Sequence, residues 1–94
     1  MELKEVILID ADNELHQTVK GMISDDYKER FIAEYKQLCI RLDKLSNILN
    51  HYHNNTLSFT LACPIPLLEI QADDMASYKI TLEERAEIEG INLD

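Results

Sequence analysis

The sequence predicts a mainly α-helical fold: a long antiparallel hairpin of two helices with a short N-terminal β-strand or β-hairpin, completed by dimerisation. Apolar residues at heptad spacing run from Phe31 to Tyr52, and a second amphipathic stretch follows two prolines. The chain has only 94 residues, and a domain of this size buries a modest fraction of its surface. We therefore divide it into an N-terminal β segment, 1–24, and a helical hairpin, 25–94.

The N-terminal segment contains one strand candidate, residues 3–10, an apolar and β-branched run closed by the turn-prone "DADN". The next stretch, residues 14–23, is ambiguous between a helix and a strand. One face of a helix would carry Leu15, Val19 and Met22. One face of a strand would carry Leu15, Gln17 and Val19. We favour the β-hairpin, because it gives the first strand a partner within the chain.

The first long helix is expected over residues 25–52. "SDDYKER" offers Ser24 or an aspartate as the N-cap, and Asp26 with Glu29 resembles a capping box. The residues that follow alternate steps of four and three, which is the seam of a helix packed along its length against another helix. These seam residues are Phe31, Tyr35, Leu38, Leu42, Leu45, Leu49 and Tyr52.

The second long helix is expected over residues 64–89, after a loop at 53–63. Pro64 and Pro66 suit a first helical turn, where a missing amide proton costs little, and Gly90 is a natural C-terminal stop. The predicted buried face consists of Leu68, Met75, Tyr78, Leu82 and Ala86. Two such helices joined by a loop of about a dozen residues should pack as an antiparallel hairpin.

A symmetric homodimer is expected because apolar residues lie beyond the surface that one partner helix can cover. The additional apolar positions are Ile32, Cys39, Ile48, Ile70 and Ile88. Exposing several such aliphatic side chains would remove a large share of the stability of so small a domain. Packing two hairpins into a four-helix arrangement would bury them.

The charge balance restricts the classes of partner. Lys and Arg number 9 against 18 Asp and Glu, for a net charge of −9. This charge argues against direct binding to nucleic acid or to an anionic membrane surface, and it favours a host protein with a basic surface. No signal peptide or membrane-spanning run is recognisable, so we expect a cytoplasmic protein. Cys39 and Cys63 are expected to be free thiols.

The acidic excess is concentrated in the second long helix. At about 100° per residue, five carboxylates fall within roughly a third of its circumference, away from the predicted buried face. We call this set the acidic ridge and take it as the candidate partner-binding site: Glu69, Asp73, Glu83, Glu84 and Glu87. A row of carboxylates can also be an ordinary solvated face.

We find no catalytic residues and no metal or cofactor site that the sequence supports. Asp10 and Asp12 resemble the acids that end the first strand of haloacid-dehalogenase phosphatases and NYN-type nucleases, but the later strands of those folds are missing. A turn closing the strand explains them better. His51, His53 and Cys63 could supply three zinc ligands, yet no fourth is evident.

Three stretches resemble a group of small proteins encoded by tailed phages, including crAss-like phages. They are "DDYKERFIAEYKQL", "TLSFTLACPIPLLEIQADDM" and "YKITLEERAEIEGINLD", and together they extend from Asp25 to Asp94. The resemblance implies a phage origin and a helical hairpin, and it supplies no catalytic residues.

The leading functional hypothesis is therefore an acidic phage protein in the cytoplasm of an infected bacterium. It would bind and inhibit a host defence component, such as a CRISPR effector, by occupancy and without catalysis. One alternative is a sponge that sequesters a nucleotide immune signal near the helix N-termini or the N-terminal segment, where free amides favour phosphate. Another is a phage structural or assembly protein.

Overall fold

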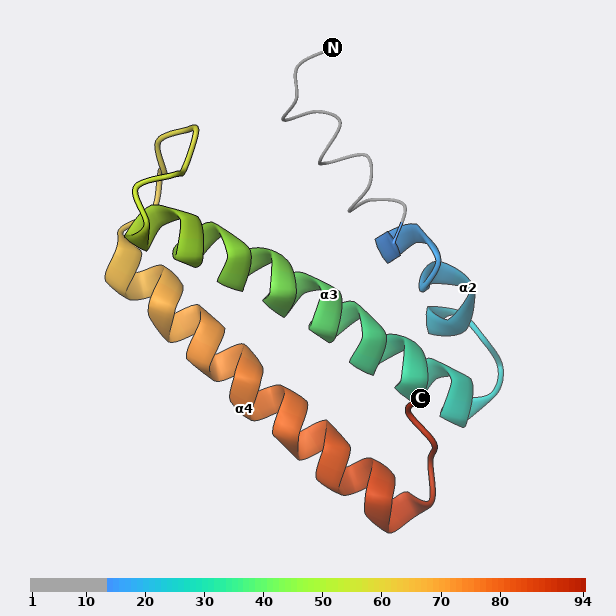
Figure 1. The fold of residues 1–94 in the computed structure, drawn as a ribbon. Coiled ribbons are helices and arrows are strands. Elements are labelled where there is room, and N and C mark those ends of the chain that lie inside the picture. Colours follow the sequence, from blue (N-terminus) through green and yellow to red (C-terminus); the bar gives the residue numbers. More distant parts are fainter. Residues whose placement is uncertain (1–13) are drawn as a thin grey trace.

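The computed structural model describes residues 14–94, which include the three helices α2, α3 and α4; residues 14–16 are also helical. The short helix α2 spans Val19–Met22, and the long helices α3 and α4 span Tyr27–His53 and Ile65–Glu89. Helices α3 and α4 lie antiparallel and side by side, while α2 lies against the N-terminal half of α3 on the side away from α4 (Figure 1). The predicted two-helix hairpin is thus confirmed.

The start of α3 is fixed by two polar side chains. Asp26 is the N-cap, and its Oδ1 accepts a hydrogen bond from the backbone N–H of Lys28 at 3.0 Å. The Ser24 hydroxyl oxygen accepts a bond from the backbone N–H of Asp26 at 3.1 Å, and the same hydroxyl donates to Glu29. Glu29 therefore contributes to the cap through its hydrogen bond with the Ser24 hydroxyl and not through a bond with Asp26.

The prolines determine where α4 begins, and the glycine determines where it ends. Pro64 is its N-cap, with Pro66 in the first turn. Gly90 adopts a left-handed conformation with φ of 71°, which a glycine reaches without steric cost. The backbone N–H of Ile91 then bonds to the carbonyl of Ala86 at 2.8 Å, and the tail turns back toward α3 (Figure 1). Ile91 is consequently buried.

The core lies between the N-terminal half of α3 and the C-terminal half of α4. Its buried cluster consists of Phe31, Leu38, Leu82, Ala86 and Ile91. Two residues predicted to be buried are exposed instead: Tyr52 of the seam and Tyr78 of the predicted buried face of α4, each at 44%. The Tyr78 hydroxyl donates to Glu34 at the edge of the helix pair, which draws this ring away from the core.

The predicted β-hairpin is wrong where the structure tests it. Its second strand, residues 14–23, is helical or turned, and no strand occurs anywhere in 14–94. The backbone N–H of Met22 bonds to Thr18 and that of Ile23 to Val19, so local bonds satisfy this backbone without a partner strand. The first strand candidate, 3–10, lies outside the described residues.

The described helices do not include a membrane span, since none in 14–94 combines sufficient length with sufficient apolar character. Cys39 and Cys63 are both free thiols, as expected.

Candidate functional site

A groove lies between the N-terminal residues 14–21 and α3. It contains two neighbouring hollows of about 340 Å³ and about 510 Å³ that share Thr18 and Lys36 in their walls. We call this feature the N-terminal groove. Its walls are formed by Glu14, Gln17, Thr18, Lys20 and Gly21 from the N-terminal side and by Glu29, Ile32, Ala33, Tyr35, Lys36, Cys39 and Ile40 from α3.

The N-terminal wall is held against α3 by small residues. Thr18 is only 6% exposed, and its hydroxyl donates to the carbonyl of Leu15 at 2.6 Å. Gly21 sits directly over Ala33, which is itself buried. The larger apolar side chains of the same segment, Val19 and Ile23, point away and remain exposed. The contact with α3 is therefore close, and it uses little apolar surface from the segment.

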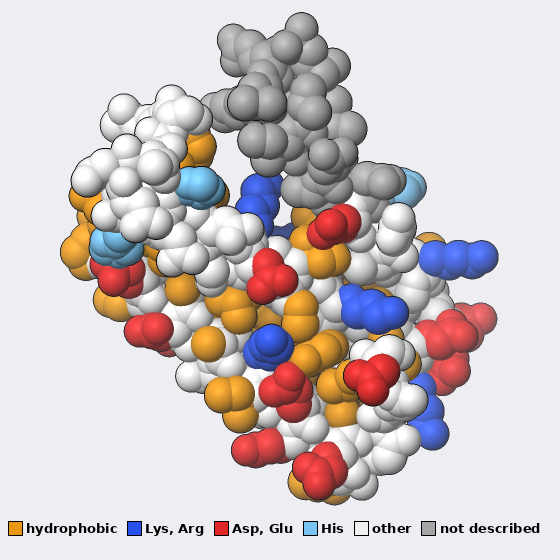
Figure 2. Space-filling view, viewed as in Figure 1, with side chains coloured by type: hydrophobic (Ala, Val, Ile, Leu, Met, Phe, Trp, Pro, Cys, Tyr) orange, Lys and Arg blue, Asp and Glu red, His pale blue; other side chains and the backbone are white. Residues whose placement is uncertain are grey.

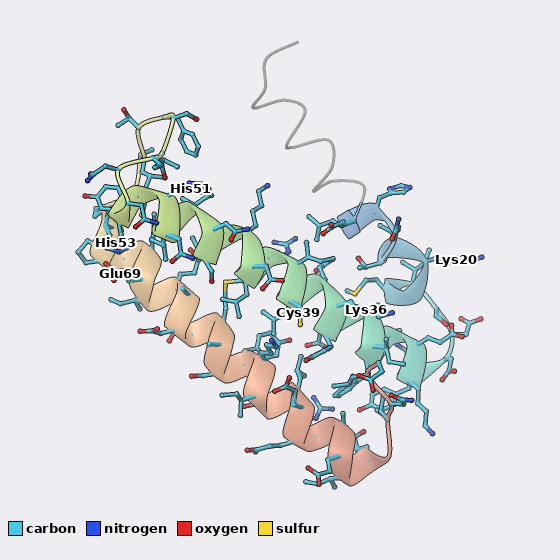
Figure 3. All side chains as sticks on the ribbon, viewed as in Figure 1. Lys20, Lys36, Cys39, His51, His53 and Glu69 are labelled. Carbon is cyan, nitrogen blue, oxygen red and sulfur yellow. The ribbon has the colours of Figure 1, made fainter. Side chains whose placement is uncertain are left out.

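Two lysines come from opposite walls of the N-terminal groove. Lys36 lies on α3 on the side that faces α2, and Lys20 extends outward from α2 (Figure 3). Within residues 14–94, neither ammonium group makes an ion pair. The chain has twice as many acids as bases, so two cations that have no carboxylate partner among residues 14–94 are candidates for binding an anionic ligand.

The charge is distributed unevenly between the two long helices. Helix α3 carries five bases and three acids: Lys28, Arg30, Lys36, Arg41 and Lys44 against Glu29, Glu34 and Asp43. Helix α4 carries two bases, Lys79 and Arg85, and seven acids. The difference is +2 for α3 and −5 for α4, counting histidine as neutral. The N-terminal groove is thus built on the long helix of positive charge.

Tyr35 links the N-terminal groove to α4. Its hydroxyl donates to Oε2 of Glu83 at 2.5 Å. This hydrogen bond to a carboxylate, together with burial, raises the pKa of Tyr35 well above its ordinary value. The phenol therefore stays uncharged at neutral pH, and it fixes Glu83 beside α3. Cys39, one turn further along α3, adds a half-buried thiol to the same wall.

All five residues of the acidic ridge are exposed. Two of them have partners: Glu83 accepts the bond from Tyr35, and Oε2 of Glu69 lies 4.0 Å from Nε2 of His53. Carboxylates are visible along α4 on the face shown in Figure 2. Whether the ridge binds a partner stays a prediction.

The other candidates from the sequence do not assemble into a site. Nδ1 of His51 lies 2.8 Å from the hydroxyl of Thr56, while His53 is turned toward Glu69 (Figure 3). Among residues 14–94, no three His, Cys, Asp or Glu side chains come close enough to hold a metal ion. Asp10 and Asp12 lie outside the described residues.

The lysines of the N-terminal groove were not among the residues selected from the sequence. Lys20 and Lys36 are separated along the chain by the end of α2, a turn and the first third of α3, so whether they line one hollow depends on how α2 packs on α3. One signal was available, because residues 25–52 carry five acids and five bases in an otherwise acidic chain. That balance marks the first long helix as the place where an anion would be least repelled.

The family model that matches this chain is described as Sequestin, and the match covers residues 25–88. It includes α3 and nearly all of α4, and hence the α3 wall of the N-terminal groove; the wall formed by residues 14–21 precedes it. Comparisons with curated proteins and with solved structures gave no match.

Proposed function

We propose, from the premise that the chain belongs to the Sequestin family, that it is a non-catalytic phage protein that sequesters a nucleotide immune signal. The family model matches 64 of the 94 residues, 25–88. The family name denotes sequestration, which favours the holding of a ligand over the inhibition of a large host complex. This proposal places the binding site in the N-terminal groove.

The observation that carries the proposal is the pair of lysines without carboxylate partners on opposite walls of this groove. An ammonium group binds phosphate oxygens as a compact point charge with three donors. Lys20 and Lys36 could therefore contact phosphoryl groups, while Ile32 and Ile40 offer apolar surface to a base or sugar. A few polar groups on a mostly apolar concave surface is the usual composition of a small-molecule site.

Among residues 14–94, the acids other than Glu14 and Glu29 do not line this groove, so the overall acidity does not prevent such binding. Seven of them belong to α4, and Glu83, the one nearest to Tyr35, is occupied by that phenol. Glu14 and Glu29 do line the groove, and a carboxylate there suits sugar hydroxyls better than phosphate. The site therefore favours a ligand that carries both phosphate and hydroxyl groups.

A thermal-shift screen against cyclic and linear nucleotides tests the proposal. A ligand that binds only the native state raises its apparent stability, by about 2.7 kcal/mol at a hundred times its Kd. We expect at least one phosphate-bearing nucleotide to raise the melting temperature, and the corresponding nucleoside without phosphate to have a much smaller effect. If no nucleotide stabilises the protein, the sponge hypothesis fails.

A second candidate function is the inhibition of a host defence component through the acidic ridge. Asp73, Glu84 and Glu87 favour it, because their carboxylates are exposed and form no ion pair within residues 14–94. Reversing Glu84 and Glu87 to Lys should abolish protection of phage against a host defence if this surface binds a basic partner. Unchanged protection would identify the ridge as a solvated face.

We also propose that the protein is a homodimer. Several large apolar side chains are exposed on the described surface, among them Ile88 at 85%, Ile23 at 77%, Leu67 at 56% and Ile70 at 54%. Ile70 and Ile88 are two of the positions whose apolar character predicted dimerisation. A second copy of the chain could cover these side chains by an interface in which both copies use the same surface.

A further inference from the structure

The contact between α2 and α3 is closer than an ordinary helix contact allows, and one glycine permits it. A Cβ atom placed on Gly21 would lie 2.8 Å from the Cβ of Ala33 and 3.3 Å from the carbonyl oxygen of Glu29. Carbon atoms pack at about 3.5 to 4.0 Å. Any side chain at position 21 must therefore move the N-terminal segment away from α3.

Backbone conformation does not explain this glycine. Gly21 lies within α2, and among the described residues only Gly90 is a glycine with positive φ. Glycine is one of the poorest residues for a helix interior, so its presence there weakens α2. The reason for glycine at position 21 is the space that it leaves for Ala33.

The orientation of α2 supports the same reading. Helical spacing places Leu15, Val19 and Met22 on one apolar face, which would normally turn inward. Instead, Val19 is 44% and Met22 38% exposed, while the adjacent face with Thr18 and Gly21 meets α3. The segment thus leaves apolar surface in contact with water and brings its backbone close to α3.

We propose that Gly21 and Ala33 are positioning residues that set the width of the N-terminal groove and so the separation of its two lysines. This inference rests on the proposed function. Gly21, Ala33, Lys20 and Lys36 all line the same hollow, so a shift at the Gly21–Ala33 contact changes the distance between the walls directly. Attraction between an ammonium group and a phosphate falls with distance, and a hydrogen bond between them is lost beyond about 3.2 Å. Groove width therefore selects ligands whose phosphates fit both lysines.

Three variants test the proposal: Gly21→Ala, Ala33→Gly and the two combined. The probe is inorganic pyrophosphate, titrated while backbone amide shifts of Thr18 and Lys36 are followed by NMR. Gly21→Ala should weaken binding about tenfold, the effect of losing one charge-assisted hydrogen bond. The double variant removes the opposing methyl group and should recover affinity to within about threefold of the original protein.

Recovery of pyrophosphate affinity in the double variant distinguishes a positioning role of Gly21 and Ala33 from an effect on the stability of the fold. Ala33→Gly weakens α3 as a helix, so the double variant should be less stable than Gly21→Ala while it binds pyrophosphate more tightly. Circular dichroism confirms that each variant is folded at the titration temperature. If Gly21→Ala binds as well as the original protein, or if a folded double variant fails to recover affinity, the positioning role is refuted and the proposed function still stands. If the original protein shows no response to pyrophosphate at Thr18 and Lys36, both the inference and the phosphate site are refuted.

Discussion

Changing Lys36 should weaken nucleotide binding more than changing any other single lysine of the described chain. Among residues 14–94 it is the only base that lines both hollows of the N-terminal groove, and it forms no ion pair with any of these residues. Lys36→Ala removes one cation from the site and leaves the fold without a buried unpaired group, because this side chain is exposed. The variant therefore reports on the ligand contact rather than on folding.

The expected magnitude follows from that exposure. A hydrogen bond to a charged group contributes about 1.5 to 3 kcal/mol, and we take the lower end because water reaches Lys36. Lys36→Ala should then raise Kd about tenfold. Lys36→Glu adds repulsion of about 1 kcal/mol, the value for two charges about 4 Å apart in water, and should raise Kd about fiftyfold in total.

Isothermal titration calorimetry with the nucleotide that gives the largest thermal shift measures these values. Lys28→Ala is the matched control, since Lys28 is also an exposed lysine of α3 but does not line the N-terminal groove. Eight helical residues separate the two positions by about 12 Å, which exceeds the Debye length of about 8 Å at physiological salt. The control should change Kd by less than about twofold. Equal effects of Lys28→Ala and Lys36→Ala would refute a specific site at Lys36.

Two further predictions concern assembly and pH. Light scattering at micromolar concentration should give twice the mass of the 10.9 kDa chain. Replacing Ile70 and Ile88 by Ser should lower that mass if these side chains lie in the interface. A monomeric mass for the original protein would refute the homodimer. The free energy of unfolding should fall as pH rises above about 10. The reason is that the hydrogen bond to Glu83 raises the pKa of Tyr35 in the folded state. The stabilisation by this bond is complete below the unfolded-state pKa of the tyrosine and is lost as pH rises toward the folded-state pKa. Tyr35→Phe should flatten part of this dependence in urea titrations at pH 8 and pH 11, and an unchanged slope would show that the bond does not couple to folding.

The long helices were predictable because their signals are local and agree with one another. The heptad spacing after Asp26, the prolines at 64 and 66 and the left-handed Gly90 each specify one end or one face of a helix. Burial agrees with the seam at Phe31 and Leu38 and with the predicted buried face of α4 at Leu82. Where a tyrosine occupied a predicted buried position the pattern was less reliable, since its hydroxyl can draw the ring to the surface, as in Tyr78.

The N-terminal segment and the groove could not be predicted in the same way. Over ten residues, Leu15 and Val19 fit a helix and a strand equally well, and the choice depends on packing. The deciding contact joins Gly21 to Ala33, twelve positions apart and across a turn. Lys20 and Lys36 line one hollow because α2 packs on α3 through that same contact, so no spacing in the sequence indicates them.

Recovery of the bound ligand tests the central claim most directly. The protein is mixed with a slight molar deficit of the nucleotide that stabilises it, and the free nucleotide is measured in a filtrate before and after heat denaturation. Sequestration predicts that the filtrate loses the nucleotide in proportion to the protein added, and that heating returns it chemically unchanged. A nucleotide that stays in the filtrate, or that returns as a different compound, would contradict the claim that this chain is a non-catalytic sponge.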